Sequence, residues 1–379
     1  MDLDLTDDEE LFLETTDRFL SRSLPTSTLR RLIDDGIGID RDLWSSGAEL
    51  GWTSMLVPEE FGGGSISGDG VRDLGIVAEV LGRHLFPGPV LTTDIVAFAL
   101  ARRGSSDLAG EILPALVSGA RTATWALPDL RRSTEGAPEL VAAGDAFELS
   151  CARALVQDAH VADHVLVVTA SPSGPTQVLV PSSAAGVEIQ VLDGLDLTRR
   201  YCQVRFDRVE VRASDVVGEP GRAAPDVELQ LALAVALQCA ETVGATDRVY
   251  DMTLEYVKDR KSFGRSIGSY QALKHRLADM LLWLESAKAV TVAALEAVQR
   301  ASEAGADQGD GASEAASLAK SFVADRCPAI VRDCFQMHGG IACTWEHDLH
   351  LFMRRVDANS AIYGGLDHHR DRLAPAVGF

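Results

Sequence analysis

One carboxylate stands in an otherwise apolar stretch of this 379-residue chain. Glu241 lies in the run LALAVALQCAETVGAT, residues 231–246, where it is the only charged side chain. Burying a carboxylate without a partner is costly, and burial raises its pKa toward the range that suits a general base. Two interpretations follow. Glu241 is a catalytic base, or it pairs with a cation from a neighbouring helix, Arg276 being one candidate.

Three other patterns that often carry chemistry are incomplete in this chain. The FGGG run at residues 61–64 lacks the Lys-Ser/Thr of a phosphate-binding P-loop, and no GxGxxG segment opens a strand–helix unit. Five histidines near the C-terminus lack the spacing of metal ligands, and the six cysteines include no CxxC pair. We therefore expect neither a Rossmann nucleotide site nor a metal site.

The overall charge argues against several classes of partner. The chain carries 56 acidic and 35 basic side chains, a formal net charge of −21. A surface this acidic repels nucleic-acid phosphates and anionic membranes. The first residues are acidic where a signal peptide is basic, and no run of about 18 apolar residues indicates a membrane helix. We expect a cytoplasmic protein that binds neither nucleic acid nor membranes.

The elements that must position these residues change type twice along the chain. Residues 1–120 have the apolar spacing of helices. Residues 121–221 consist of short β-rich runs separated by Gly, Pro, Asp and Ser, as in a sandwich or small barrel. Residues 222–379 return to long helical patterns. We predict an α+β fold with an N-terminal all-α domain, a middle β-barrel or sandwich domain and a C-terminal four-helix bundle. The long helices are expected at 226–260, 270–303, 313–337 and 345–373.

Three stretches, in this order, resemble the signatures of the acyl-CoA dehydrogenase family. The first is LWSSGAELGWTSMLVPEEFGGG, at residues 43–64. The second, DRKSFGRSIGSYQALKHRLADM at 259–280, contains the Arg-x-x-Phe-Gly motif followed by Gln. The third, QMHGGIACTWEHDLHLFMRR at 336–355, contains the Gln-x-x-Gly-Gly segment. The helix–β–helix order of that family covers essentially the whole chain, which looks most like its bacterial branch.

The resemblance implies FAD as the cofactor, bound between the β domain and the C-terminal bundle and covered by a neighbouring subunit. Arg260 matches the position that pairs with the pyrophosphate, and a planar, permanently charged guanidinium suits a phosphate. Ser262 adds a hydroxyl donor, and Phe263 adds an apolar wall. The other matched positions contact FAD from the next helix or reach a neighbour's FAD: Gln271, Gln336, Gly339 and Gly340.

The chain departs from this family at the catalytic base. The family removes an α-proton with a carboxylate, often the Glu of a Tyr-Glu-Gly-Thr motif, where this chain has Gly364. Other members place the base on the helix before the Arg motif, and that position is Ala234. Glu241 lies seven residues beyond Ala234, nearly two turns, on the same side of a helix. Glu241 is therefore the candidate base, with ion pairing as the alternative.

As a whole, the resemblance implies FAD-dependent α,β-desaturation of an acyl-CoA thioester, an oxidoreductase reaction of fatty acid or steroid side-chain catabolism. Electrons would pass to an electron-transferring flavoprotein. The chain would form a homotetramer, or a heterotetramer with another acyl-CoA dehydrogenase-like chain. The missing base motivates an alternative, a catalytically silent subunit that completes the FAD site of a heteromeric enzyme. A third hypothesis, a DNA-interacting member of the fold, is disfavoured by the net charge of −21.

Overall fold

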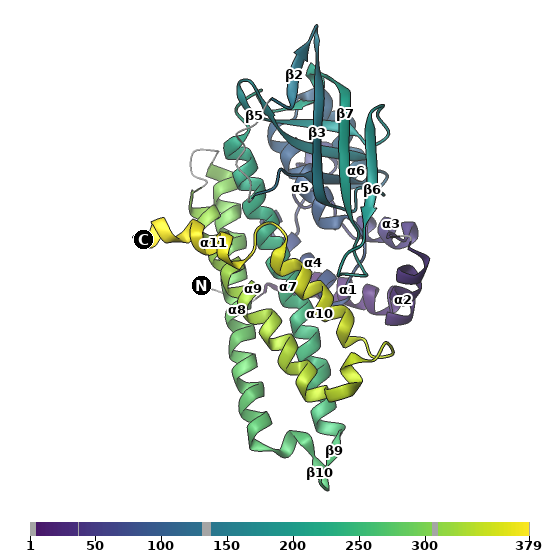
Figure 1. The fold of residues 1–379 in the computed structure, drawn as a ribbon, viewed down its shortest axis with the longest axis vertical. Coiled ribbons are helices and arrows are strands. Elements are labelled where there is room, and N and C mark those ends of the chain that lie inside the picture. The colour runs from purple at the N-terminus through teal and green to yellow at the C-terminus, as the bar shows by residue number, and fades with distance from the viewer. Residues whose placement is uncertain (1–4, 37, 131–137, 305–309, 379) are drawn as a thin grey trace.

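The chain folds into a β region at one end, long helices that run to the other end, and N-terminal helices packed beside both (Figure 1). The computed structural model describes residues 5–36, 38–130, 138–304 and 310–378. Helices precede and follow a region of strands, so the architecture is α+β and the predicted fold class is confirmed.

Six α-helices form in the described part of the N-terminal region, and the first shows how local sequence starts them. α1 (Asp7–Ser23) begins at Thr6, whose hydroxyl accepts a hydrogen bond from the backbone N–H of Glu9. The Glu9 carboxylate in turn accepts from the N–H of Thr6 at 2.8 Å. This capping box satisfies N–H groups that a helix leaves free at its start. The other helices are α2 (Thr26–Asp35), α3 (Arg41–Glu49), α4 (Gly70–Arg83), α5 (Val90–Arg103) and α6 (Ser106–Val117).

The described strands of the β region form two four-stranded sheets that face each other. One has the order β1–β4–β5–β8 and the other β2–β3–β7–β6. Val165, Val178 and Phe206 belong to the apolar core between them, and this sandwich confirms the predicted sheet architecture. Trp125 and Leu166, on the other face of the first sheet, join the core of the helices. The strands are β1 (Ala123–Ala126), β2 (Leu140–Ala143), β3 (Ala146–Gln157), β4 (His164–Ser171), β5 (Gly174–Pro181), β6 (Val187–Leu192), β7 (Tyr201–Arg212) and β8 (Val216–Val217).

The central helix of the C-terminal bundle is α7 (Ala224–Asp259). Every side chain from Leu229 to Thr246 is buried. By length and hydropathy this helix could cross a membrane, but its whole apolar window is buried inside the protein, as in the core helix of a globular fold. A short hairpin of β9 (Lys261–Ser262) and β10 (Arg265–Ser266) follows at the tip of the bundle. The remaining helices are α8 (Gln271–Ala304), α9 (Asp310–His338), α10 (Leu349–Ala361) and α11 (Leu366–Leu373).

The α4 and α7 helices cross at unusually close range. A Cβ added to Gly82 of α4 would overlap the backbone carbonyl of Glu241 on α7. Reciprocally, a Cβ added to Gly244 of α7 would overlap the carbonyl of Glu79 on α4. Each helix therefore presents a glycine to the other's backbone, and the crossing fixes the position of Glu241 relative to the N-terminal helices.

The helix predicted over 345–373 is interrupted in the structure. α10 ends at Ala361 and α11 begins at Leu366. Between them Tyr363 has a φ of 60° and Gly364 a φ of 98°. Two consecutive residues at positive φ cannot continue a right-handed helix, so the chain turns at this point. The turn contains Gly364, which the motif comparison matches to the family's usual base.

Candidate functional site

The first group of predicted cofactor residues lies at the hairpin tip. α7 ends at Asp259, Arg260 follows as its C-cap, and the turn of the hairpin is formed by Phe263 and Gly264, both at positive φ. The Phe263 side chain is 95% exposed, an extreme value for a large apolar residue. The Arg260 side chain is exposed and forms no ion pair within the described parts of the chain. Gln271 is the first residue of α8 and is exposed as well.

The second group, from the Gln-x-x-Gly-Gly segment, lies beside the first. The ring of Tyr256, one turn before Arg260, stacks on His338 with centroids 4.3 Å apart. The Tyr256 hydroxyl also donates to the backbone carbonyl of His338 at 3.3 Å. Gly339 and Gly340 follow His338 directly, and a Cβ on either would meet nothing within 4 Å. The structure therefore brings the two predicted groups together at one end of the chain.

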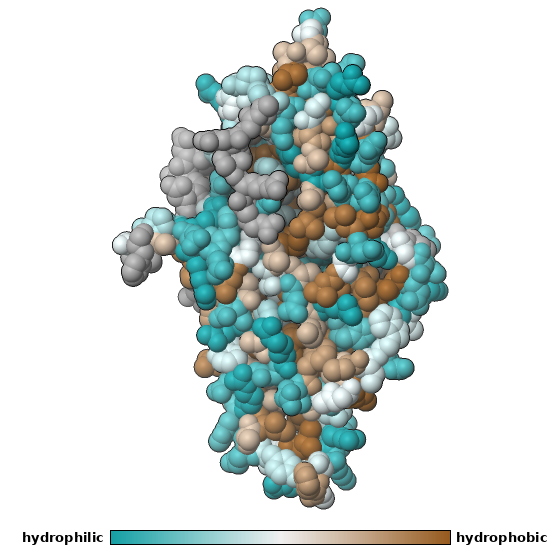
Figure 2. Space-filling model, in the orientation of Figure 1, coloured by the Kyte–Doolittle hydropathy of each residue, from teal (hydrophilic) through white to brown (hydrophobic). Residues whose placement is uncertain are grey.

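This end of the molecule has a donor set that fits a dinucleotide. It combines the exposed guanidinium of Arg260 with the hydroxyl of Ser262. Two exposed amide side chains and the exposed backbone of two glycines complete the set: Gln271, Gln336, Gly339 and Gly340. Such groups suit a pyrophosphate and its attached sugar and base. Figure 2 shows hydrophobic residues exposed at the same lower end, where Figure 1 labels β9 and β10. Phe263 is exposed beside these donors, and large exposed apolar side chains of this kind are common at interaction surfaces.

The middle of α7 lies near the turn after α10, which contains Gly364, one of the two positions predicted for the base. The rings of Tyr363 and Trp125 of β1 lie 6.3 Å apart between centroids. A Cβ at Gly364 would lie 2.5 Å from Cδ2 of His368, so even a small side chain there would force the ring to move. Ala234 is 2% exposed and packed in the middle of α7. Neither position offers a carboxylate.

Glu241 lies in this region and is completely buried. Its two oxygens accept four hydrogen bonds. Arg199 donates two, from Nη1 to Oε2 at 2.9 Å and from Nη2 to Oε1 at 2.5 Å. Arg355 of α10 donates from Nη1 to Oε1 at 2.9 Å. Asn359 of α10 donates from Nδ2 to Oε2 at 2.8 Å.

The same cluster continues into the loop before β7. Arg355 is completely buried and also pairs with Asp196, and its Nη2 donates to the Thr198 hydroxyl at 2.6 Å. Two arginines are thus balanced by two carboxylates, Glu241 and Asp196. The cluster joins α7, α10 and the β region through charge-assisted bonds.

The pKa of Glu241 is shifted in the direction opposite to that expected from the sequence. Burial raises the pKa of this carboxyl, but the charges and hydrogen bonds of Arg199 and Arg355 outweigh burial and lower its pKa to about 2. The expected raised pKa is therefore wrong. The pairing interpretation is confirmed with partners other than Arg276, which pairs with Asp333. A carboxylate with four hydrogen bonds and so low a pKa is a poor proton acceptor.

Two buried side chains, Lys320 and His369, hold the turn after α10. The Lys320 ammonium is buried and donates to the carbonyls of Asn359 at 2.5 Å and Ile362 at 3.0 Å, and to the side-chain oxygen of Gln238. His369 contacts the Tyr363 carbonyl through Nε2 at 3.0 Å. Burial lowers the pKa of Lys320 to about 8. These contacts fix the backbone on both sides of the break.

The two arginines that bind Glu241 were not identified from the sequence. Arg199 and Arg355 are 42 and 114 residues from Glu241 along the chain. A buried carboxylate requires a counter-charge, but one sequence does not say which of its 35 basic residues supplies it. Among the described residues no group of three His, Cys, Asp or Glu side chains could hold a metal ion.

Comparisons with known proteins agree with the order of helices, strands and helices in this chain. The N-terminal domain model of the acyl-CoA dehydrogenases matches residues 6–120, and the C-terminal domain model matches residues 227–378. Acyl-CoA dehydrogenase IpdE2 of Mycolicibacterium smegmatis is 30% identical over 374 residues, which cover 98% of this chain and 100% of that protein.

Solved structures show the same fold over the whole length. A chain of the ChsE4-ChsE5 complex from Mycobacterium tuberculosis is 26% identical with a TM-score of 0.87, covering 100% of this chain and 99% of that one. Butyryl-CoA dehydrogenase from Megasphaera elsdenii has a TM-score of 0.88 at 21% identity and covers 100% of both chains. With two matching domain models and a full-length relative, this chain belongs to the acyl-CoA dehydrogenase family, whose members are oxidoreductases.

Proposed function

We propose that this chain takes part in FAD-dependent α,β-dehydrogenation of an acyl-CoA thioester as the subunit that completes a partner's FAD site. The observation that carries the proposal is the contrast between the hairpin end of α7 and the middle of that helix. The hairpin end retains every side chain of the dinucleotide-binding pattern, and Arg260 there is exposed and forms no ion pair within the described residues. The middle of α7 and the turn after α10 have Ala234 and Gly364 at the two base positions, and the buried carboxylate in the middle of α7, Glu241, is bound by two arginines.

The dehydrogenation needs a carboxylate at the α-carbon of the thioester. When bound, FAD supplies the acceptor for the hydride that leaves the β-carbon. In this chain Arg260 would hold the pyrophosphate and Gln271 would contact the dinucleotide, while Gln336, Gly339 and Gly340 would extend the same surface. The base that removes the α-proton would come from a second chain, whose own β region would hold the flavin ring.

Partners of this kind are consistent with the relatives. The ChsE4-ChsE5 structure is a complex of two different chains. A heterotetramer with an acyl-CoA dehydrogenase-like chain is therefore the proposed assembly, with a homotetramer as the alternative. A cytoplasmic location and an electron-transferring flavoprotein as the electron acceptor complete the proposal.

The test is to purify this chain alone and together with a base-bearing family member encoded in the same genome. Each sample is examined for flavin absorbance and for anaerobic bleaching by acyl-CoA thioesters, from short linear to steroid side-chain. We expect bleaching from the pair and none from the chain alone. Arg260→Ala should reduce the FAD content of the pair, and Arg205→Ala, an exposed arginine on β7, should not.

Bleaching by the chain alone would refute the silent role and assign the complete reaction to this chain. In that case Glu241→Gln, assayed in the same way, would decide whether Glu241 acts in proton removal. A loss of about 10²–10⁴-fold in flavin reduction is the effect of removing a positioned general base.

A further inference from the structure

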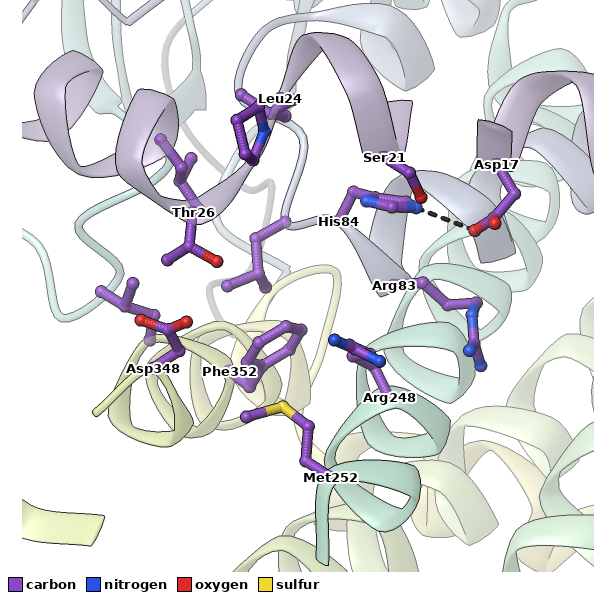
Figure 3. Close-up of a pocket in the computed structure, with 14 residues that line it drawn as sticks. Asp17, Ser21, Leu24, Thr26, Arg83, His84, Arg248, Met252, Asp348 and Phe352 are labelled. Atoms are coloured by element: carbon purple, nitrogen blue, oxygen red, sulfur yellow. Dashed lines mark hydrogen bonds and ion pairs between the residues drawn. The ribbon is translucent and has the colours of Figure 1, made fainter. Parts of the chain in front are cut away.

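A cavity of about 350 Å³ lies between the N-terminal helices and the bundle (Figure 3). Its described wall carries charges of both signs, because Asp17 lies 2.8 Å from the ring of His84 and Arg248 belongs to the same wall. These side chains favour neither an anion nor a cation, so the cavity does not define a class of ligand. The proposed dinucleotide surface contains a group that does, the imidazole of His338.

Two aromatic neighbours fix the ring of His338. This residue is the last of α9, and Gly339 and Gly340 follow it directly. The buried ring stacks on Tyr256 and meets the ring of His347 edge-on, with centroids 5.1 Å apart. Packing on one face and at one edge restricts rotation of the ring, so each of its two nitrogens has fixed surroundings.

A single hydrogen bond sets the tautomer of this ring. Nδ1 of His338 lies 2.9 Å from the backbone carbonyl of Cys334. A carbonyl oxygen only accepts, so the proton is assigned to Nδ1. Burial lowers the pKa of His338, the bond to Cys334 opposes that shift, and His347 lowers the pKa further. The ring is therefore neutral at pH 7, and Nε2 carries a lone pair.

The fold does not use this lone pair. Nε2 forms no hydrogen bond with any residue in the described ranges, and the surrounding protein does not enclose it. The stacking partner Tyr256 precedes Arg260 by one helical turn, about 6 Å along α7. The lone pair thus lies near the guanidinium proposed to hold the pyrophosphate, beside the open backbone of Gly339 and Gly340.

The lone pair needs a different ligand group from its neighbours. Arg260 and the N–H groups of the two glycines donate, so they suit phosphate oxygens. Nε2 of a neutral imidazole only accepts, and it would repel a phosphate oxygen. Because the flavin ring is assigned to the partner's β region, the aromatic N–H donor left for this surface is the amino group of adenine.

We propose that Nε2 of His338 accepts a hydrogen bond from the exocyclic amino group of the adenine of FAD, which makes this surface selective for an adenine dinucleotide. The inference rests on the proposed function, in which the surface completes a partner's FAD site. Hypoxanthine has a carbonyl oxygen where adenine has the amino group. That oxygen would face the lone pair of His338, and a site built for a donor rejects an analogue that lacks it.

The experiment measures the dissociation constants of FAD and of flavin hypoxanthine dinucleotide by flavin fluorescence at pH 7. The protein is this full-length chain assembled with its base-bearing partner and freed of flavin. His338→Phe keeps a ring to stack on Tyr256 and removes the acceptor, whereas His338→Gln returns an acceptor oxygen. His275→Phe is the matched control, since His275 is an exposed histidine on α8.

We expect FAD to bind about 2–10-fold more tightly than the hypoxanthine analogue, the effect of one neutral hydrogen bond. His338→Phe should bring this ratio close to one, His338→Gln should retain part of it, and His275→Phe should leave it unchanged. Equal binding of the two ligands by the unmodified protein, or loss of the ratio in the control, would overturn the inference. Equal weakening of both ligands by His338→Phe would assign the ring a packing role and overturn it as well.

A second variant separates this inference from the proposed function. Arg260→Ala should weaken both dinucleotides alike, because they share the pyrophosphate. If it weakens neither, the placement of the dinucleotide is wrong and both proposals fail. If it weakens both while the unmodified protein does not distinguish the two purines, the proposed function stands and the role of His338 is refuted.

Discussion

Replacing Glu241 by glutamine should destabilise the fold, because the carboxylate neutralises two buried arginines. Glutamine keeps the size of the side chain but has one acceptor oxygen, and its amide N–H groups would point at guanidinium donors. Arg199 would then lose its ion-pair partner, whereas Arg355 would keep its pair with Asp196. Removing one partner of a buried pair costs about 3–5 kcal/mol.

The expected thermal shift follows from the size of the chain. Unfolding entropy is about 2.1 cal/mol/K per residue, or about 0.8 kcal/mol/K for 379 residues. A loss of about 3–5 kcal/mol therefore lowers Tm by about 4–6 °C. The assay is calorimetric unfolding at pH 7 of the variant and of Glu255→Gln, which removes an exposed glutamate without a described partner from the same helix.

The control variant should unfold within about 1 °C of the unmodified protein, since exposed substitutions have small effects. An equally small shift for Glu241→Gln would refute the buried cluster. If the variant kept its stability and lost flavin reduction, the carboxylate would be acting on the substrate rather than on the two arginines. The two outcomes therefore separate the structural role from the catalytic one.

Three further predictions concern other sites. Arg260→Ala should leave Tm unchanged but release FAD on dialysis of the assembled protein, because a charge-assisted contact of about 1.5–3 kcal/mol is lost, and flavin absorbance measures this. Asp94→Asn should stabilise the chain at pH 7, because burial raises the pKa of Asp94 well above its usual value. The gain in the free energy of unfolding is absent below about pH 3.8 and grows as the pH rises above it, which denaturation at several pH values would detect. Gly364→Glu should lower stability by about 1–3 kcal/mol, since φ is 98° and the new Cβ meets His368. A thermal shift in the double variant with His368→Ala would measure how much of that loss is the ring contact.

The order and type of the elements could be predicted because they depend on local patterns. The apolar spacing of the helices and the short β-rich runs follow from contacts between near neighbours in the chain. The break at Tyr363 could not be predicted in this way, since helical spacing continues on both sides of it and Lys320, which binds the carbonyls of Asn359 and Ile362, lies on α9.

In the candidate site, too, the parts that depend on local motifs could be predicted and the parts that depend on distant residues could not. The seven cofactor positions are predicted from the family motifs, and in the structure the two groups lie side by side through Tyr256 and His338. For Glu241 the sequence established only that a carboxylate in an apolar helix needs a special environment. Whether that environment raises or lowers the pKa depends on Arg199 and Arg355, which are distant in sequence.

The glycine crossing of α4 and α7 has a mechanical consequence. Because Gly82 and Gly244 each receive the other helix's carbonyl, sliding either helix by one residue would drive a Cβ into a backbone atom. The N-terminal helices and the bundle are therefore coupled as one rigid body at this joint. Any opening of the protein that admits a large ligand must therefore occur in the β region and the surface turns, where hydrogen exchange should be fastest.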